Sequence, residues 1–305
     1  MRDLSIIIVS LNIKDLLKEC LESVYEKEKR ANIEIFVVDN ASDDGTPEMV
    51  EKEFPQVKII RNRKNIGFGP ANNMGMRRAN GRYVLLLNPD TKIITKNIFS
   101  EMVAWMDKHP KVGISSCALL NPDLTYQGSG GYSPTIFRVL AWMTFLDDIP
   151  VLDRVIKPYH PLHTWSPFYK GEEYFARPHE QDWVTGAFFM MRRKAMEDVG
   201  FFDEDYFTYV EEVDYSYRTK KKGWKIWYLP RWRIVHYGQV TTGSERAMIN
   251  EFEGLKLFYR KHKPGWQTPI LRFFLKLGAA ARIVIFGILK GPNVAKTYVK
   301  AFKVA

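Results

Sequence analysis

Strand and helix patterns alternate with short links through the first 120 residues, and this alternation constrains the fold more than any other feature. Leu4–Val9 and Ile33–Val38 are apolar runs typical of strands, and Lys14–Glu28 between them has apolar residues at helical spacing. Further strands are predicted at 57–60 and 83–87, with helices near 46–53, 70–79 and 96–108. Such alternation favours an α/β fold whose doubly wound, mostly parallel sheet is flanked by helices.

A loop with two polar side chains follows the most apolar of these strands. Leu85–Leu87 is expected to be buried on both faces, and Pro89 ends the strand between Asn88 and Asp90. Ligands of open α/β sheets gather outside the carboxyl ends of the strands, where an aspartate can bind a hard cation that bridges a diphosphate. A solvated Asn-Pro-Asp turn is the simpler alternative.

Polar side chains also follow the first two strands. Ser10 and Asn12 come just after the first strand and Asp39 just after the second, so both sets are expected at the same sheet edge as Asn88 and Asp90. Asp39 can accept the ring N–H of uracil or thymine, or it can cap the turn that follows it.

The segment NIGFGPANNMG (65–75) leads into a predicted helix, with Asn65 and Gly67 before it and Asn73 in its first turn. Backbone amides and the helix dipole at such a helix start can meet an anionic or polyhydroxylated ligand. A plain helix entry explains the glycines equally well.

A second group of ionisable residues lies downstream, where Glu211, Glu212 and Asp214 begin a predicted helix and His236 closes a strand. Acidic residues complement the helix dipole, and Arg218 can pair with Asp214 one turn away. That account leaves the doubled glutamate and the histidine unexplained. In the functional alternative, one carboxylate is a general base and His236 is a metal ligand or phosphate contact.

Between these parts, residues 121–182 are irregular. Seven prolines interrupt the segment, and its many aromatic side chains argue against disorder. It offers stacking faces without a pattern, namely Tyr126, Tyr132, Trp142, His160, His163 and Trp165. Regular patterns return with predicted strands at 184–191, 224–228 and 233–236 and helices at 211–222 and 244–262.

The net charge of +10 predicts an anionic partner. Its concentration near the C-terminus disfavours a nucleic-acid-binding module. In 268–290, Arg272, Lys276, Arg282 and Lys290 fall within about a third of the helical circumference, which predicts a basic amphipathic helix on a membrane surface. Phe273, Phe274, Ile283, Ile285 and Phe286 are expected opposite the charges. Docking of this helix on the core or on a second copy in a homodimer is the alternative.

The chain has only two cysteines, Cys20 and Cys117, both in apolar or helical contexts. A disulfide framework is therefore not expected, and a reducing compartment fits. The apolar N-terminal run is followed at once by polar and charged residues without a cleavage pattern, so a first strand is predicted rather than a signal peptide.

Taken in order, these motifs resemble those of a family 2 inverting glycosyltransferase of the GT-A fold, close to the rhamnosyltransferase-like branch. The resemblance covers roughly 230 residues and rests on VVDNASDDGT, NIGFGPANN, LLLNPD, WVTGAFFMMRR, GFFDEDYFTYVEEVDYSYR and the histidine of IVHYG. It implies a nucleotide-sugar-binding half at 1–120, an acceptor-binding and catalytic half at 121–240, and C-terminal helices at 241–305.

The resemblance also implies roles for single residues. Asp39 would read the base beside the Ser10–Asn12 segment, and Asn88 would face the ribose or donor sugar. Asp90, with His236 as a further ligand, would hold Mg²⁺ or Mn²⁺ on the diphosphate. Because Asn88 replaces the first aspartate of an Asp-X-Asp motif, one negative charge is lost and metal binding should weaken.

For the transfer step, the resemblance makes Glu212 the general base, a glutamate where the family usually has aspartate, with Glu211 and Asp214 as alternatives. Trp183 and Gly186 would begin the acceptor site. The implied reaction is a single inverting displacement from a dTDP- or UDP-linked sugar, with rhamnose favoured, onto a glycan or polyprenyl-linked glycan at the inner face of the cell membrane. A catalytically idle relative and a nucleotidyltransferase are the rival functions.

Overall fold

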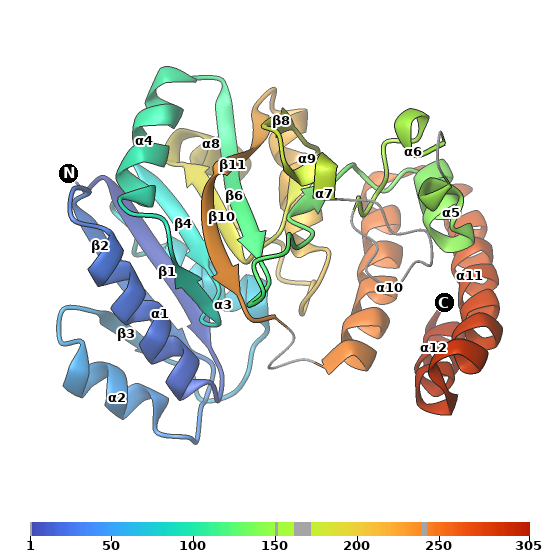
Figure 1. Ribbon diagram of the computed structural model, residues 1–305, viewed down its shortest axis with the longest axis horizontal. Coiled ribbons are helices and arrows are strands. Elements are labelled where there is room, and N and C mark those ends of the chain that lie inside the picture. The colour runs from blue at the N-terminus through green and yellow to red at the C-terminus, as the bar shows by residue number, and fades with distance from the viewer. Residues whose placement is uncertain (1, 150–151, 162–171, 239–242) are drawn as a thin grey trace.

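The computed structural model describes residues 2–149, 152–161, 172–238 and 243–305. Its described residues form a nine-stranded mixed sheet in the order β3-β2-β1-β4-β10-β6-β11-β5, with β8 paired to β11 (Figure 1). The strands are β1 Leu4–Ser10, β2 Ile33–Asp39, β3 Lys58–Arg61, β4 Tyr83–Leu87, β5 Thr91–Ile93, β6 Val112–Leu120, β8 His179–Glu180, β10 Phe188–Arg192 and β11 Lys225–His236. A separate two-stranded sheet pairs β7 Gly130–Gly131 with β9 Trp183–Val184.

Helices cover the sheet and continue beyond it. Those of the first 120 residues are α1 Lys14–Lys27, α2 Thr46–Glu53, α3 Phe68–Met76 and α4 Ile98–Lys108. The later helical elements are α5 Ile136–Thr144, η1 Leu146–Asp148, α6 Leu152–Val155, α7 Glu172–Phe175, α8 Arg193–Val199, α9 Glu211–Lys221, α10 Gly243–His262, α11 Gln267–Lys290 and α12 Pro292–Val304.

The first half of the sheet has the predicted parallel arrangement. Strands β3, β2, β1 and β4 run parallel, and Ser10 pairs in register with Asp39, so the polar residues after these strands meet at one edge. Antiparallel β10 then separates β4 from β6. The predicted α/β class with a mostly parallel sheet flanked by helices is therefore confirmed.

Several strands depart from the sequence pattern. The strand predicted at 184–191 is two strands, β9 and β10, because a turn at 186–187 interrupts it, and β5 and β8 were not predicted. The single strand β11 replaces the two short strands predicted at 224–228 and 233–236, and its register against β6 shifts between Leu229 and Arg233, around Pro230. The fully buried β6 was not predicted, because two serines break its apolar run. Ser116 Oγ donates to Phe188 O at 2.7 Å, which satisfies one of these buried hydroxyls.

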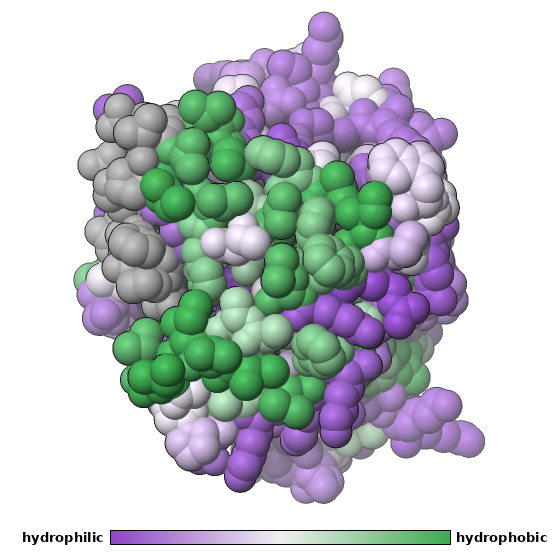
Figure 2. Space-filling view, turned by 90° about the vertical axis from the view of Figure 1, so that its right-hand side faces the viewer, coloured by the Kyte–Doolittle hydropathy of each residue, from purple (hydrophilic) through white to green (hydrophobic). Residues whose placement is uncertain are grey.

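The C-terminal helices pack together with α5 beside the sheet and form a second core (Figure 1). This confirms the predicted helical appendage. In the described part of the chain, no helix combines the length and apolar character that crossing a membrane requires. Figure 2 looks onto these helices and shows a broad apolar area on their outer side.

The predicted basic stripe on 268–290 is wrong at one position. Arg282 is buried, and its guanidinium donates to Trp142 O and Met143 O, each at 2.7 Å. Phe286 is buried as well. Helix α5 covers this side of α11, and periodicity within one helix gives no information about the helix that packs on it.

Candidate active site

The carboxyl ends of β1 and β2 present two buried polar atoms without partners. Neither Ser10 Oγ nor Asp39 Oδ1 has a hydrogen-bond partner among the described residues. Asp39 Oδ2 accepts from Ser42 N at 3.1 Å, so one oxygen caps the following turn while the other stays unpartnered. An unpaired buried polar atom costs about 1–3 kcal/mol, which favours a ligand at this edge.

Asn12 links the loops that follow these two strands. Its backbone is left-handed with φ 49°, its N–H donates to Ser42 Oγ at 2.9 Å, and its Oδ1 accepts from Asp43 N at 2.8 Å. The side chain thus fixes the shape of the wall beside Asp39.

The glycine-containing segment joins the sheet edge to a distant loop. Asn65 Oδ1 accepts from Gly67 N at 2.9 Å and from Asn40 Nδ2 at 3.1 Å. Gly67 has φ 91°, and a Cβ there would lie 2.4 Å from Phe207 O, so only glycine fits this close approach. Phe68 N donates to the same carbonyl at 2.9 Å, which ties the start of α3 to the loop that leads into α9.

Asn73 is used within the fold. The side chain is fully buried, its Nδ2 donates to Phe202 O and Glu204 Oε1 at 2.9 Å each, and its Oδ1 accepts from Phe202 N at 2.9 Å. These contacts hold the 202–204 turn against α3 and occupy the hydrogen-bonding groups of Asn73.

Asn88, Asp90 and His236 come together although 148 positions separate the first from the last. Pairing of β11 with β5 places His236 opposite Thr91, and Thr91 Oγ1 donates to Asn88 O at 2.7 Å. His236 Nε2 lies 3.3 Å from Asp90 Oδ1 and 3.3 Å from Asn88 Nδ2. Asp90 Oδ2 also accepts from Gly238 N at 3.2 Å.

The donor set at this point suits a divalent cation. Gln127 Nε2 donates to His236 O at 2.6 Å, so its Oε1, 2.8 Å from His236 Nδ1, accepts a hydrogen bond from that nitrogen. His236 Nε2 is then the ring nitrogen that faces Asp90, and metal-ligating histidines are usually held by an outer hydrogen bond of this kind. The described residues contain no cluster of three such ligands, so oxygens of a diphosphate and water would complete the coordination.

Glu211 and Glu212 lie next to each other at the start of α9, and the charge of Glu212 makes the ionised form of Glu211 less favourable. Both carboxylates have a buried Oε2 without a partner among the described residues. Burial and then the charge of Glu212 raise the pKa of Glu211 well above its usual range. Burial and the charge of Glu251 raise the pKa of Glu212 to about 7. Carboxyl groups whose pKa values are perturbed in this way concentrate at functional sites.

The backbone that positions these glutamates is unusual. Tyr209 and Val210, immediately before Glu211, both have left-handed backbones, with φ 69° and 70°. Such conformations cost about 1–3 kcal/mol each in residues other than glycine and concentrate at functional sites.

Glu251 and Tyr159 were not predicted as site residues, and His160 was predicted only as one of several stacking faces. His160 Nε2 lies 2.6 Å from Glu251 Oε1, and its ring lies between Trp142 and Trp183 with centroid distances of 5.2 and 5.4 Å. Burial, followed by the charges of Glu251 and Glu212, raises the pKa of Tyr159. Glu251 comes from α10, and nothing in its local sequence indicates that it lies near α9.

Asp214 has both carboxylate oxygens occupied. Its Oδ2 accepts from Arg218 Nε at 2.8 Å, the pair expected from the helical spacing, and its Oδ1 lies 2.5 Å from His262 Nε2. The side chain is fully buried. Asp214 therefore joins α9 to α10.

Trp183 and Gly186 lie in tightly packed surroundings. Trp183 is buried, packs beside Tyr159 at 5.7 Å between ring centroids, and has an unpartnered Nε1 among the described residues. A Cβ on Gly186 would lie 2.9 Å from Phe68 Cζ, so this glycine admits the aromatic ring. Of the other aromatic candidates, Tyr126, Tyr132 and Trp142 are described, whereas His163 and Trp165 lie outside the described residues.

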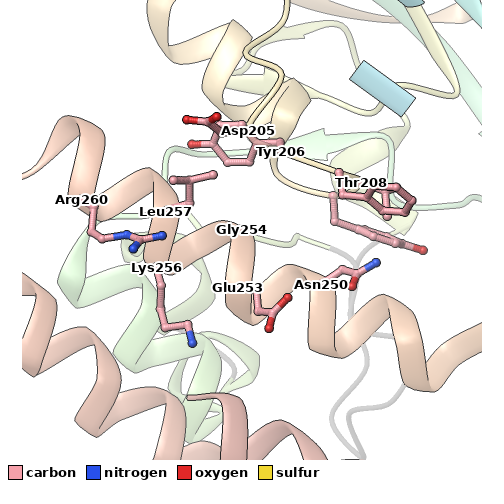
Figure 3. A pocket seen from close by; sticks show the side chains of 11 residues that line it. Asp205, Tyr206, Thr208, Asn250, Glu253, Gly254, Lys256, Leu257 and Arg260 are labelled. Atoms are coloured by element: carbon pink, nitrogen blue, oxygen red, sulfur yellow. The ribbon is translucent and has the colours of Figure 1, made fainter. Parts of the chain in front are cut away.

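A cavity of about 300 Å³ opens between the 205–209 loop and α10. Figure 3 shows Tyr206 and Thr208 of the loop on one side and Asn250 and Glu253 of α10 on the other. The loop leads directly into Glu211, so the cavity borders the segment that carries both glutamates. Its mixed aromatic and polar lining suits a polyhydroxylated ligand.

Comparison with known proteins identifies relatives of this chain. Residues 5–200 match the model of glycosyl transferase family 2. The chain is 26% identical over 263 residues, 82% of each chain, to the N-acetylglucosaminyl-diphospho-decaprenol L-rhamnosyltransferase of Mycobacterium tuberculosis. It is also 26% identical over 229 residues, 73% of this chain and 64% of the other, to the low-salt glycan biosynthesis hexosyltransferase Agl10 of Haloferax volcanii.

Solved structures share the fold at low sequence identity. The mannosyltransferase PcManGT of Pyrobaculum calidifontis, in complex with GDP-Man and Mn²⁺, aligns with a TM-score of 0.59 and 18% identity over 99% of this chain and 88% of that one. S. aureus TarS 1-349, in complex with UDP-GlcNAc, aligns with a TM-score of 0.55 and 17% identity over 98% and 79%. Since the family model matches most of the chain and the strand ends carry the motifs of the resemblance, this protein is a glycosyltransferase of family 2, with the GT-A fold.

Proposed function

We propose that this protein transfers a sugar, with rhamnose the favoured donor group, from a dTDP- or UDP-linked donor to a hydroxyl of a glycan or polyprenyl-linked glycan. The observation that carries the proposal is the unpartnered Asp39 oxygen at the same sheet edge as the Asp90–His236 pair. Rhamnose and the lipid-linked acceptor follow from the name of the M. tuberculosis relative, which covers most of both chains.

The nucleotide-sugar half supplies binding groups for the donor. Asp39 accepts the ring N–H of the pyrimidine beside Ser10 and Asn12, and Asn88 faces the ribose or donor sugar. Asp90 and His236 would hold Mg²⁺ or Mn²⁺, and the bound cation would supply positive charge to balance the charge of the leaving diphosphate. Asn65, Gly67 and Asn73 maintain this half by holding the α3 entry and the 202–204 turn.

Glu212 is the general base of the proposed reaction. With a pKa of about 7 it is about half ionised at neutral pH, whereas burial and the charge of Glu212 raise the pKa of Glu211 well above its usual range. Glu212 takes the proton of the acceptor hydroxyl as that oxygen bonds to the anomeric carbon and the bond to the nucleoside diphosphate breaks on the opposite face. The configuration inverts. A positioned base of this kind contributes roughly 10²–10⁴-fold to the rate.

The acceptor enters from the side of the molecule that carries α10. Trp183 and Gly186 begin the acceptor site, and the cavity between the 205–209 loop and α10 borders the segment that leads into the base. An acceptor anchored in lipid places the enzyme in the cytoplasm at the inner face of the cell membrane, with a contact through 268–290. Packing of the same helix in a homodimer is the alternative arrangement.

Ligand-dependent stability tests the donor assignment. Thermal unfolding is measured with dTDP-rhamnose, UDP-glucose and GDP-mannose, each with and without Mn²⁺. A ligand present at 100 times its Kd stabilises the fold by about 2.7 kcal/mol, so a pyrimidine donor with Mn²⁺ should raise the Tm by several degrees. Asp39→Ala should abolish the shift. An equal response to GDP-mannose would contradict a pyrimidine-reading Asp39.

Transfer itself separates the enzyme from an idle sugar-nucleotide-binding relative. Glu212→Gln should retain the thermal shift by the donor and lose transfer by about 10²-fold or more. A parent protein that binds the donor but transfers no labelled sugar to a lipid-linked acceptor would favour the idle relative. A Glu212→Gln variant with the parent rate would move the base to Glu211 or Asp214.

A further inference from the structure

An apolar surface covers the outer side of the C-terminal helices, and more than one helix makes it. Helix α11 packs along α5, and η1 joins α5 to α6, so the three helices form one continuous side of the molecule. Large apolar side chains are exposed along it, up to 79% for Ile288 and 77% for Val155. We call this the apolar face, and its most exposed members are Phe137, Val155, Phe273, Val284, Ile288 and Leu289. Figure 2 shows the apolar area on this side.

The positive charge of the protein lies in the same region. Residues 254–305 contain eleven Lys and Arg and no Asp or Glu. The rest of the chain has 34 Lys and Arg against 35 Asp and Glu, so it is nearly neutral and the net charge of +10 comes from this region. Arg272 and Lys290 are exposed on α11, and Lys157 is exposed two residues after Val155.

Exposed apolar side chains together with a high positive charge favour a membrane over a second copy of the chain as the partner of the apolar face. In a symmetric dimer, an isologous contact would bring two copies of the same basic helices together, and their like charges would repel. An anionic bilayer accepts both features, because apolar side chains enter the boundary between headgroups and acyl chains while Lys and Arg contact the headgroups.

We propose that the apolar face docks on an anionic membrane surface, with α5, α6 and α11 lying along the bilayer. The contact is wider than the single helix expected from the sequence, and Arg282, buried under α5, takes no part in it. The purpose of this contact rests on the proposed function, since a polyprenyl-linked acceptor stays in the bilayer. Its test does not depend on that function.

Vesicle flotation of the full chain tests the proposal. The vesicles are phosphatidylcholine alone or phosphatidylcholine mixed with phosphatidylglycerol in equal parts. The parent protein should float with the anionic vesicles and much less with the neutral ones, and added salt should weaken binding. Val284→Glu/Ile288→Glu/Leu289→Glu should reduce the bound fraction by about tenfold or more, because it places carboxylates where apolar groups enter the bilayer.

Single substitutions test whether α6 takes part in membrane binding or α11 binds alone. Val155→Glu, on the α6 side, should also weaken binding, whereas Leu124→Glu, at an exposed leucine outside the face, should not. Unfolding curves that match the parent show that the variants fold. Unchanged binding of the triple variant overturns the proposal, and unchanged binding of Val155→Glu alone overturns the wide face.

Light scattering addresses the competing dimer. The parent should be monomeric without vesicles, and a dimer that the triple variant converts to monomer would overturn membrane docking. Failure of the proposed glycosyl transfer would appear as lack of transfer to every acceptor, with flotation unchanged. Failure of docking would leave transfer to a soluble acceptor intact, so the two outcomes are distinct.

Discussion

Unpartnered buried atoms separate the candidate site residues from neighbours of the same type. Asp39 and Glu211 each keep one buried oxygen without a partner among the described residues, as does Glu212, whereas both oxygens of Asp214 are engaged. Asn73 is likewise fully used by the fold. An unpartnered buried polar atom destabilises the folded state, so its retention at these positions favours a functional role.

The raised pKa of Glu212 gives a prediction about the stability of the folded protein. Its pKa rises from 4.5 to about 7 on folding, so ionisation opposes folding above pH 4.5, and the penalty is complete above pH 7. Glu212→Gln removes this penalty and should stabilise the protein by about 1–3 kcal/mol at pH 8 and by very little at pH 4. Denaturant unfolding at both pH values measures it, and equal effects at the two pH values would contradict it.

With Glu212 as the proposed base, its raised pKa should make transfer activity depend on Glu251. The charge of Glu251 helps to raise the pKa of Glu212, and the charge of Glu212 in turn helps to raise the pKa values of Glu211 and Tyr159. Transfer should rise with pH through about 7, and Glu251→Gln should move this rise to lower pH because one negative charge is removed. Glu245→Gln, on the same helix and in a surface ion pair with Lys300, is the control and should leave the pH profile unchanged. A shift of this rise to higher pH in Glu251→Gln would contradict the inference that Glu251 raises the pKa of Glu212.

At the scale of elements, the junction of α9 and α10 is held by a buried carboxylate. Asp214 contacts Arg218 within α9 and His262 at the end of α10. Asp214→Ala leaves two cationic or polar partners unpaired and should cost about 3 kcal/mol. Unfolding by denaturant measures the loss, with Asp205→Ala, at an exposed ion pair, as the control.

The same variant separates bracing from catalysis. If Asp214 only joins the helices, kcat measured well below the Tm should stay within a fewfold of the parent value. A collapse of kcat with stability retained would instead place Asp214 in the reaction, as the sequence alternative allows.

Local sequence predicted most elements and few of the contacts between them. The spacing of Asp214 and Arg218 predicts their ion pair, and the 2.8 Å contact confirms it. Nothing local predicts His262 or Glu251, because each reaches α9 from a helix that begins more than 20 residues after α9 ends. The fully buried β6 was missed because its serines find their partners only in the folded protein, Ser115 at Met106 of α4 and Ser116 at Phe188 of β10.

In the candidate site, too, local sequence predicted only part of the contacts. Asn88 and Asp90 were predicted from a strand end, whereas only the family resemblance joined His236 to Asp90 as a further metal ligand. The sheet brings all three within hydrogen-bonding range. Gln127, which orients His236, comes from the irregular segment, where residue type gives no indication of position. The roles assigned to all these residues stay predictions.

At the scale of the whole molecule, the chain consists of two packed units with separate hydrophobic cores. Most of one core lies on the sheet, and the other joins α5 to the C-terminal helices. Glu211 and Glu212 lie where the units meet, since Val210 and Val213 beside them belong to the second core. The proposed transfer, from a donor on the sheet to an acceptor on the side of the helices, should therefore depend on how the second unit is held together.

Arg282 provides the test of that dependence. Its guanidinium satisfies two carbonyls at the end of α5 and stacks on Phe145 at 4.2 Å, which fixes α5 to α11. Arg282→Met keeps the apolar stem but leaves the carbonyls unpaired, at a cost of about 2–4 kcal/mol. Because the sheet has its own core, hydrogen exchange should accelerate in α5 and α11 and remain unchanged in β1 and β4. Lys276→Met, at a partly exposed position on α11, is the matched control, and equal acceleration in the sheet would show that the two units unfold as one.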